Sequence, residues 1–436
     1  MAWGEGIRAD WLSYEEALAR ILESASSLAE SWPTERLPLR RALGRAVAES
    51  VRARATLPSW PNSAMDGFAL RSADLRAQRP EGIRFPVAGR SYPGEAPLRG
   101  LRGGVAVRVM TGGPVPEGFD TVIRVEHTDG EAEEGHVVVL RTDDVGRHVR
   151  GAGRDLRAGE EAVAAGTVVD SGAIAVLLAS GRESVAVHRR PRVGVLSSGD
   201  ELVGADRFDE VEKGLAVPDT NRGMLAGAAF EHGAVARDLG VASDDESDIR
   251  ARIADLADID VLVTTGGASM GERDLLKSVL LAVGLRLSFW RIRVRPGSPV
   301  SFGHLPVGNR RVPVFGLPGN PASAFVTFHA LVAPYLRTLG GHLRPRGTVV
   351  RCRMGDPLSS PPRITHFYRV ALAPPSADQR GGRADPASAD CWLTGPQGSD
   401  LVSSLMRADG LAIVGEGVGR VEAGDTLPVL LLPGRC

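Results

Sequence analysis

The chain has 436 residues and a formal net charge of −1, and its content of 43% hydrophobic and 24% charged residues is ordinary for a globular protein. This length accommodates about three domains, and the near-zero charge excludes a global basic field that draws a protein to nucleic acid or anionic lipid. The three cysteines, Cys352, Cys391 and Cys436, form no CxxC pair, which argues against a disulfide framework and a thiolate zinc site and favours a reducing compartment. No apolar run reaches about 18 residues and "MAWGEGIRADW" lacks a signal-peptide core, so we expect a cytoplasmic protein that does not span a membrane.

The N-terminal third changes from helical to strand patterning. Residues 11–31 have apolar positions at helical spacing, and Ser13 with Glu16 predicts a capping box at the start of this helix. Residues 37–50 predict a second short helix and its connection. From 51 to 150, short alternating segments such as "GVAVRVM" and "TVIRVE" between Gly and Pro turns predict a β-rich module.

Residues 191–339 alternate strand and helix, which predicts a doubly wound α/β unit with a parallel sheet. The strand patterns are "RVGVLSS", "AVARDLGV", "DVLVTT" and "RVPVFGLP", with a β excursion at 286–304 before the last of them. Residues 341–436 return to short strands with Gly and Pro turns, which predicts a compact β-barrel or sandwich.

Two helix starts within the α/β unit have capping residues. The helix "DTNRGMLAGAAFEHG" has Asp219, Thr220 or Asn221 as its cap, and the helix after the next strand opens with a Ser243/Glu246 capping box.

Two segments low in apolar residues predict loops. "DGEAEEGH" (129–136) is most simply a solvated hairpin loop, and residues 374–390 predict a mobile insertion.

Three loops follow strands of the α/β unit, at the sheet edge where ligands bind in open α/β folds. They are "SSGDEL" (197–202), "TTGGASMGERD" (264–274) and "GLPGNPAS" (316–323). The glycine loop has acidic residues where a Walker loop has lysine. Carboxylates repel a phosphate group, so an anionic ligand fits here when a divalent cation lies between the two. Taken alone, the third loop is better explained as a well-made strand-to-helix turn, and the double glycine of the second is equally explained as an ordinary tight turn.

The third loop has a clear backbone logic. Asn320 is placed to cap the following helix, and Pro321 takes the first helical position, where its missing N–H costs nothing. Ser323 then lies in the first turn, beside N–H groups and the positive dipole end, which favour an anion.

Seven motifs together resemble a known family. They are "SWPNSAMDGFAL" (59–70), "MTGGPVPEGFDTVIRVE" (110–126), "VGVLSSGDEL" (193–202), "PDTNRGML" (218–225), "VTTGGASMGERD" (263–274), "VRPGSPVSFG" (294–303) and "VFGLPGNPASAFVTF" (314–328). In this order they are similar to the MoeA / gephyrin E-domain family, the molybdopterin molybdenumtransferases, from about residue 11 to the C-terminus.

The resemblance implies an α/β multidomain fold with four parts. These are an extended segmented dimerisation domain (11–50 plus 150–185), a β-rich domain with the NSAMDG motif (51–149), a MogA-like doubly wound α/β domain that binds molybdopterin (186–340) and a C-terminal β-barrel (341–436). It further implies a homodimer whose active site is shared between subunits, with molybdopterin adenylyltransferase and molybdoenzymes as partners.

The implied activity is a transferase reaction of molybdenum cofactor biosynthesis. Molybdate is inserted into adenylylated molybdopterin, AMP is released, and Mg²⁺ is required. The resemblance carries the catalytic and metal-binding roles to four acidic residues: Asp66, Glu201, Asp219 and Asp274.

The resemblance also implies a larger set of substrate-binding residues. These are Thr111, Arg150, Asp155, Ser198, Gly266, Gly267, Arg291, Arg295, Ser298, Gly319, Asn320, Pro321, Ser323, Arg369 and Ser403. Some of these residues also have a purely structural explanation. Asp219 fits a helix cap, Asp274 fits a partner of the helix dipole in the first turn, and Arg369 fits an ordinary arginine on the face of a strand.

The sequence departs from the family pattern at a few positions. Arg291 and Arg295 stand where many members have lysines, and arginine binds oxyanions bidentately. Ser298 replaces a further lysine, and Pro61 stands where aspartate is common. These changes leave the choice between molybdate and tungstate open.

Two other functions remain as alternatives. One is a molybdopterin adenylyltransferase of the MogA type, against which the additional β domains argue. The other is a non-catalytic pterin-binding or scaffold paralogue, against which the intact acidic set argues.

Overall fold

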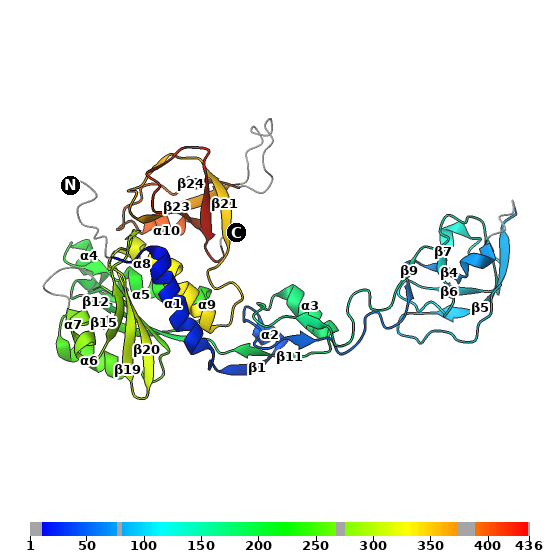
Figure 1. The fold of residues 1–436 in the computed structure, drawn as a ribbon, viewed down its shortest axis with the longest axis horizontal. Coiled ribbons are helices and arrows are strands. Elements are labelled where there is room, and N and C mark those ends of the chain that lie inside the picture. Colours follow the sequence, from blue (N-terminus) through cyan, green and yellow to red (C-terminus); the bar gives the residue numbers. More distant parts are fainter. Residues whose placement is uncertain (1–10, 76–80, 267–274, 374–388, 435–436) are drawn as a thin grey trace. The chain divides into compact units, whose positions relative to one another are not determined.

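The computed structural model describes residues 11–75, 81–266, 275–373 and 389–434, and Figure 1 labels the elements named below. The chain forms two compact units. The first unit contains residues 1–48, 165–169 and 185–436, and the second contains residues 49–164 and 170–184. The second unit is therefore an insertion into the sequence of the first. The finer division into four domains stays a prediction.

The first unit is built on a six-stranded sheet with the order β15-β12-β16-β20-β19-β17. Its strands are β12 (Arg192–Ser198), β15 (Val235–Ala242), β16 (Val261–Thr265), β17 (Arg286–Trp290), β19 (Ser301–Val307) and β20 (Arg310–Leu317). The doubly wound α/β prediction is confirmed by the parallel pairing of β15, β12, β16 and β20.

The parallel-sheet prediction is wrong at one edge, because β19 pairs antiparallel with both β20 and β17. Val307 pairs with Arg310 across the two intervening residues, Gly308 and Asn309. A turn of two residues joins only antiparallel strands. The sheet is therefore mixed.

Helices cover both faces of this sheet (Figure 1). They are α1 (Tyr14–Ala29), α5 (Thr220–Glu231), α6 (Glu246–Ala254), α7 (Leu275–Ala282), α8 (Pro321–Thr327), the π-helical turn η4 (Phe328–Val332) and α9 (Ala333–Leu339). Side chains of β16 alternate between the faces. Val261 and Val263 share a buried cluster with Leu225 of α5, whereas Leu262 belongs to the cluster of Ile249 in α6.

Two of the predicted helix caps are confirmed. Ser13 Oγ accepts from Glu16 N at 3.2 Å while Glu16 Oε2 accepts from Ser13 N at 2.7 Å, which completes the capping box of α1. Asp219 caps α5, and its Oδ1 accepts from Arg222 N at 3.2 Å.

The predicted Ser243/Glu246 capping box of α6 is wrong. The cap is Asp245, whose Oδ1 accepts from Ser247 N at 2.8 Å and from Asp248 N at 3.1 Å. Ser243 N instead donates to Asp248 Oδ2 at 2.9 Å. An ionised carboxylate that reaches two helix-start N–H groups is a stronger acceptor than a hydroxyl.

The C-terminal part of the first unit is a β-barrel, as predicted. Its strands are β18 (Val294–Arg295), β21 (Val349–Met354), β23 (Thr365–Ala373), β24 (Ala389–Leu393), β25 (Gly410–Val414) and β27 (Thr426–Leu431), and beside it lie β22 (Leu358–Ser359), β26 (Arg420–Val421) and α10 (Ser403–Met406). The ring β23-β24-β21-β27-β25 closes because β25 also pairs with β23.

Residues 374–388 of the predicted insertion at 374–390 lie outside the described residues. Its last two residues are a correction, because Ala389 pairs with Cys352 of β21 and Asp390 pairs with Ala373 of β23. They begin a barrel strand and do not belong to a loop.

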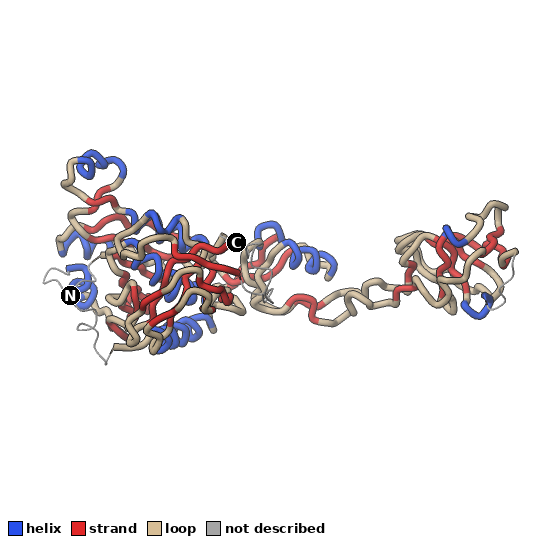
Figure 2. Tube along the Cα trace, turned by 90° about the horizontal axis from the view of Figure 1, so that it is seen from above, coloured by secondary structure: helices blue, strands red, loops and turns tan. Residues whose placement is uncertain are grey.

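The second unit contains a five-stranded sheet with the order β7-β4-β6-β5-β8, which confirms the β-rich module. Its elements are β2 (Val51–Arg52), β3 (Asn62–Ser63), β4 (Gly67–Leu70), η1 (Ser72–Leu75), β5 (Ile83–Ser91), β6 (Ala106–Val109), β7 (Thr121–Arg124), η2 (Val125–His127), β8 (His136–Val139), β9 (Val149–Arg150), β10 (Glu161–Val163) and α3 (Ser171–Ala179). Figure 2 shows that the sheet part consists of strands and loops with only short helical turns.

The loop at 129–136 is less solvated than predicted. Thr128 and Val139 bridge at its base, in keeping with a hairpin. The Glu131 side chain, however, is only 5% exposed, and Arg90 and Arg108 donate to it at 3.1 Å and 3.0 Å. Burial of this carboxylate is tolerated because two guanidinium groups compensate its charge.

The remaining elements are short. They are β1 (Thr34–Pro38), α2 (Leu39–Ala42), β11 (Ser184–His188), β13 (Leu202–Val203), η3 (Ala205–Arg207), α4 (Phe208–Glu212) and β14 (Val217–Pro218). The helix predicted within 37–50 is thus a single turn, after which Ala46 and Val47 bridge to Val168 and Val187. Among the described residues, no helix combines the length and the apolar character needed to cross a membrane.

Candidate active site

Three loops of the first unit meet at the carboxyl ends of β12, β16 and β20, as the sequence predicts. Gly266, after β16, has a φ of +88°, and a Cβ at this position would lie 2.3 Å from Ser198 O at the end of β12. A Cβ on Gly319, after β20, would lie 3.7 Å from the Cα of Gly266. Gly266 thus allows the three backbones to approach each other as no other residue type would.

Asn221 ties the same three segments together. Its Nδ2 donates to Thr265 Oγ1 at 2.8 Å and to Gly319 O at 2.6 Å, and Thr265 Oγ1 donates to Pro318 O at 3.1 Å. The Asn221 side chain is buried, and its Oδ1 has no hydrogen-bond partner among the described residues. The sequence singled out Asn221 only as a candidate cap and missed this role.

Glu201 and Asp219 lie in the first unit but in different environments. Glu201 is exposed, and its carboxylate folds over Gly199, where a Cβ would lie 2.6 Å from Oε1. The Asp219 side chain is 1% exposed, accepts from Arg222 Nε at 2.7 Å and accepts from Ser197 Oγ at 3.1 Å. Of these two residues, Glu201 is the one whose carboxylate is accessible.

The start of α8 is fastened to a loop that follows the barrel strand β24. Pro321 occupies the first turn as predicted, but the Asn320 side chain forms no cap. Asn320 Nδ2 instead donates to Ser399 Oγ at 3.0 Å, and Ala322 N donates to Ser399 O at 3.0 Å. Ser323 is buried in the same turn. One of the N–H groups expected to face an anion is therefore already used.

Arg369 of β23 is a fully buried cation. Its Nε donates to Ser404 Oγ at 2.8 Å, and its Nη2 donates to Gly398 O at 3.0 Å. Burial lowers the pKa of its guanidinium, and Asp400 acts in the opposite direction. Nη1 has no hydrogen-bond partner among the described residues. The strand-face alternative for Arg369 does not hold, since the side chain points inward.

The serine beside Arg369 is Ser404 and not the predicted Ser403. Ser404 is 5% exposed and also donates from Oγ to Leu401 O at 2.8 Å, whereas Ser403 is exposed. The two serines are adjacent on α10, where one residue step turns the side chain by about 100°.

The 291–298 segment packs against α8. A Cβ on Gly297 would lie 2.2 Å from Thr327 Cγ2. Arg291, whose φ is +69°, lies with its guanidinium carbon 4.7 Å from the ring centre of Trp290 and 5.3 Å from that of Trp11. Ser298 Oγ donates to Ile292 O at 2.7 Å. Ser298 therefore closes its own turn and does not substitute for a free cation.

Arg295 is the other predicted cation of this segment. It lies in β18, which pairs with His366 of β23 in parallel register. Burial lowers the pKa of the His366 imidazole to about 3, and the charge of Arg295 acts in the same direction. The segment thus presents guanidinium charge to the barrel strand that carries Arg369.

The "NSAMDG" motif of the second unit is joined to the "MTGG" motif. Ser63 N donates to Gly113 O at 2.9 Å, and Gly112 N donates back to Ser63 O at 2.8 Å. Asp66 Oδ1 accepts from Thr111 N at 2.6 Å and from Thr111 Oγ1 at 2.8 Å. These two hydrogen bonds lower the pKa of the exposed Asp66 carboxyl group, the backbone one more strongly.

Arg150 and Asp155 lie on a third segment of this unit. Arg150 pairs with Asn62 between β9 and β3, so it is next to the "NSAMDG" motif. Asp155 is exposed, and its backbone N–H donates to Leu57 O at 3.1 Å. The structure thus joins the backbone of Arg150 to the "NSAMDG" motif and the backbone of Asp155 to Leu57.

Comparison with known proteins places these segments in one family. Family models match the MoeA N-terminal region (domain I and II) at residues 12–181, a probable molybdopterin binding domain at 194–338 and the MoeA C-terminal region (domain IV) at 351–432. A protein of Haemophilus influenzae named molybdopterin molybdenumtransferase is 32% identical over 432 residues, which cover 96% of this chain and 98% of that protein. The chain belongs to the MoeA family of molybdopterin molybdenumtransferases.

Further relatives agree with this assignment to the MoeA family. A Mycobacterium tuberculosis protein named molybdopterin molybdenumtransferase 1 is 32% identical over 439 residues, covering 96% of this chain and 99% of that one. The fold matches the crystal structure of a molybdopterin biosynthesis moeA protein from Pyrococcus horikoshii OT3 with a TM-score of 0.80 at 24% identity, over 97% of this chain and 100% of that chain.

The four acidic residues expected from the MoeA family are only partly described. Asp66 belongs to the second unit, Glu201 and Asp219 belong to the first, and Asp274, like Gly267, lies outside the described residues. Within the described part of the chain, no three His, Cys, Asp or Glu side chains group closely enough to hold a metal ion. Their shared role therefore stays a prediction.

Proposed function

We propose that this chain inserts molybdenum into adenylylated molybdopterin, releases AMP and forms the molybdenum cofactor with the help of Mg²⁺. Membership of a family whose curated relatives are named molybdopterin molybdenumtransferase supports the reaction class. The observation that carries the proposal furthest is the buried guanidinium of Arg369, whose Nη1 has no hydrogen-bond partner among the described residues.

Arg369 has the properties of an oxyanion ligand. Its Nη1 is buried and has no hydrogen-bond partner among the described residues. A buried donor without a partner costs about 1–3 kcal/mol, so such a group is retained more readily when a ligand completes it. A planar guanidinium matches the oxygens of an oxyanion, and Ser404 and Gly398 O hold it in place. Molybdate is the oxyanion substrate that the family names imply.

The accessible carboxylates fit a hard divalent cation. Asp66 uses Oδ1 for Thr111, and its Oδ2 accepts no hydrogen bond from the described residues. Glu201 is exposed and has no side-chain partner among those residues. Mg²⁺ binds through one or two carboxylates together with substrate phosphate oxygens. When bound, it supplies positive charge that polarises the phosphoryl group.

Asp219 fits a different role from the one predicted. Both of its oxygens are engaged by Arg222 and Ser197, and the side chain is buried. Removing it would leave the start of α5 without its cap and would leave Arg222 with Asp238 as its remaining acidic partner. We therefore assign Asp219 to holding α5, and with it Asn221, against the glycine loops.

The decisive experiment measures AMP release from adenylylated molybdopterin with Mg²⁺, with and without molybdate. We expect molybdate-dependent release by the wild type and a loss of at least about 100-fold in Asp66→Asn, because a ligand charge is removed. Absence of release by folded wild-type protein, over a range of molybdate and tungstate, would refute the proposal and favour a binding or scaffold protein. ATP consumption with molybdopterin would instead indicate an adenylyltransferase.

A mixing experiment tests the proposed homodimer with a shared site. Asp66→Asn and Glu201→Gln are each expected to be inactive. If Asp66 and Glu201 of one site come from different subunits, each mixed dimer contains one intact site, and random mixing restores about a quarter of wild-type activity. If both residues come from one chain, every site carries a lesion and the mixture stays inactive. Light scattering checks that the protein is dimeric.

A further inference from the structure

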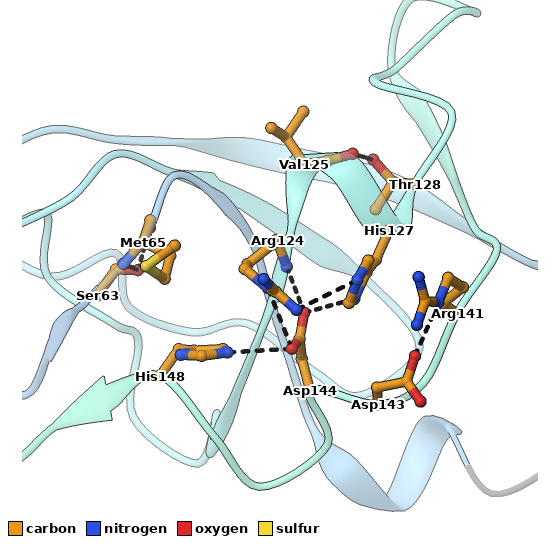
Figure 3. Close-up of polar contacts among 10 residues, drawn as sticks. All are labelled: Ser63, Met65, Arg124, Val125, His127, Thr128, Arg141, Asp143, Asp144 and His148. Carbon is orange, nitrogen blue, oxygen red and sulfur yellow. Dashed lines mark hydrogen bonds and ion pairs between the residues drawn. The ribbon is translucent and has the colours of Figure 1, made fainter.

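Asp144 is a buried carboxylate to which three cationic or titratable side chains of the second unit point (Figure 3). It is 1% exposed and lies in the loop between β8 and β9. Its oxygens accept from Arg124 N at 3.1 Å, from Arg124 Nε at 3.1 Å and from His148 Nε2 at 3.0 Å. His127 Nδ1 lies 2.8 Å from Oδ2.

The two main partners of Asp144 hold opposite ends of the "NSAMDG" turn. Arg124 is paired with Gly67 across β7 and β4, and the next residue, Val125, donates its N–H to Asp66 O at 3.1 Å. At the other end, Ala64 N donates to His148 O at 2.8 Å. Within the turn, Ser63 Oγ donates to Met65 O at 2.5 Å, which Figure 3 also shows. Asp144 thus connects the strands on both sides of Asp66.

His148 is held in a strained backbone conformation. Its φ is +67°, in the left-handed region where a Cβ comes too close to the following carbonyl oxygen. Such strain persists only where the surroundings determine the conformation. Here the side chain is fixed by Asp144 and the carbonyl group by Ala64. The position of the Ala64 N–H therefore depends on the contact with Asp144.

The charge balance explains why Asp144 is a carboxylate. Burial by itself raises the pKa of Asp144, but the hydrogen bonds from Arg124 and then from His148 outweigh this, and the pKa falls below its usual range. His127 Nε2 lies 3.2 Å from Nη2 of Arg124. Because the guanidinium donates, Nε2 accepts, and the proton of a neutral imidazole resides on Nδ1, which lies near Asp144 Oδ2 without forming a hydrogen bond among the described residues.

We propose that Asp144 is a positioning residue for the reaction, which holds the Asp66 carboxylate and Thr111 in register through Arg124 and His148. The expected effect on catalysis rests on the proposed function. The expected effect on the position of Asp66 rests on the geometry around Asp144 alone. Asp144 is itself buried, so it acts through these two residues. Its role resembles that of a group that orients a metal ligand by hydrogen bonding without binding the metal itself.

The test compares Asp144→Asn with Glu131→Gln, a matched control in which a buried carboxylate of the same unit also loses its charge beside two arginines. We expect Asp144→Asn to lower kcat for AMP release by about 10–100-fold with a change in KM below about 3-fold. We expect Glu131→Gln to retain kcat within about 2-fold. In the Asp66→Asn background, Asp144→Asn should cost nothing further, because both changes act on one group.

Hydrogen exchange separates failure of this inference from failure of the proposed function. In Asp144→Asn, peptides that contain Ala64 and Thr111 should exchange faster than in the wild type, while the core strand β4 stays protected. This readout does not depend on activity. Equal exchange in Asp144→Asn and the wild type, or equal acceleration in both carboxylate variants, overturns the positioning role.

A variant pair at position 148 adds a rescue test. His148→Ala removes the side chain that reaches Asp144 and should reproduce the kcat defect. His148→Asn should restore activity to within about 3-fold of wild type, because asparagine tolerates positive φ and donates a hydrogen bond from its amide. Equal activity of both variants contradicts the inference.

Discussion

The backbone N–H and the hydroxyl group of Thr111 both donate to Oδ1 of Asp66, at 2.6 Å and 2.8 Å. Two motifs that are 45 residues apart therefore meet at one carboxylate oxygen. The other oxygen, Oδ2, accepts no hydrogen bond from the described residues. This arrangement keeps Asp66 ionised, since both hydrogen bonds favour the charged form and lower its pKa.

Thr111→Val should shift the acid limb of activity to higher pH. The variant keeps the N–H donor but loses the hydroxyl group, so the pKa of Asp66 rises toward its ordinary value and the ionised form is lost sooner as pH falls. A pH–rate profile of AMP release measures the shift. Ser72→Ala is the control, because Ser72 Oγ donates to Asp120 Oδ2 at 2.6 Å in the same unit but away from Asp66. The same shift in both variants would contradict the prediction.

Molybdate should stabilise the wild-type protein against heat, and Arg369→Gln should abolish this effect. A ligand at 100 times its Kd stabilises by about 2.7 kcal/mol, which thermal unfolding detects. Arg353→Gln is the control, because Arg353 donates to Asp390 in the same barrel at 2.7 Å. Both variants should unfold earlier without ligand, but only Arg353→Gln should keep the molybdate-dependent rise. A full rise in Arg369→Gln would remove Arg369 from the oxyanion site.

Gly67→Ala should destabilise the second unit by roughly 3 kcal/mol or more. A Cβ at position 67 would lie 2.0 Å from Ile123 O, a backbone atom that cannot move aside without breaking the β4–β7 pairing. Gly227→Ala is the opposite case. Gly227 is exposed within α5 and a Cβ there meets nothing within 4 Å, so alanine should add about 0.5–1 kcal/mol. Calorimetric unfolding of both variants decides the sign.

Acid should weaken the first unit through His342. Burial, and next the charge of Arg337, lowers the pKa of His342 from 6.5 to about 4. Between these pH values the unfolded chain binds a proton that the folded chain does not, so this stability contribution is complete above pH 6.5 and is lost as pH falls to about 4. The loss amounts to on the order of 1–3 kcal/mol. His342→Asn should flatten the dependence of the unfolding midpoint on pH. Identical slopes in variant and wild type would assign the acid sensitivity elsewhere.

Local patterns predicted most of the regular elements. The strand "RVGVLSS" coincides with β12, and the Ser13/Glu16 box starts α1, because both depend on residues within one turn or one strand. The α6 cap failed for a local reason as well, since "SDDESD" offers overlapping capping registers and only the carboxylate of Asp245 reaches two N–H groups.

Long-range partners could not be predicted from local patterns. The antiparallel edge depends on which strand β19 meets after its turn. Asn221 contacts residues 44 and 98 positions away, and no spacing rule links them. The burial of Asp219 against Arg222 likewise appears only once β12 supplies Ser197. The choice of Ser404 over Ser403 depends on the rotation of a single helical turn.

The ring formed by β23, β24, β21, β27 and β25 has a consequence for self-association. Among the described residues, each of these five strands is paired on both sides, so the ring itself presents no free strand edge for strand addition. The six-stranded sheet does end in edges, at β15 and β17. The β15 edge carries Arg237 and Asp238, charges that oppose pairing with a second chain. Resistance to aggregation is thus provided by topology in the barrel and by charge in the sheet.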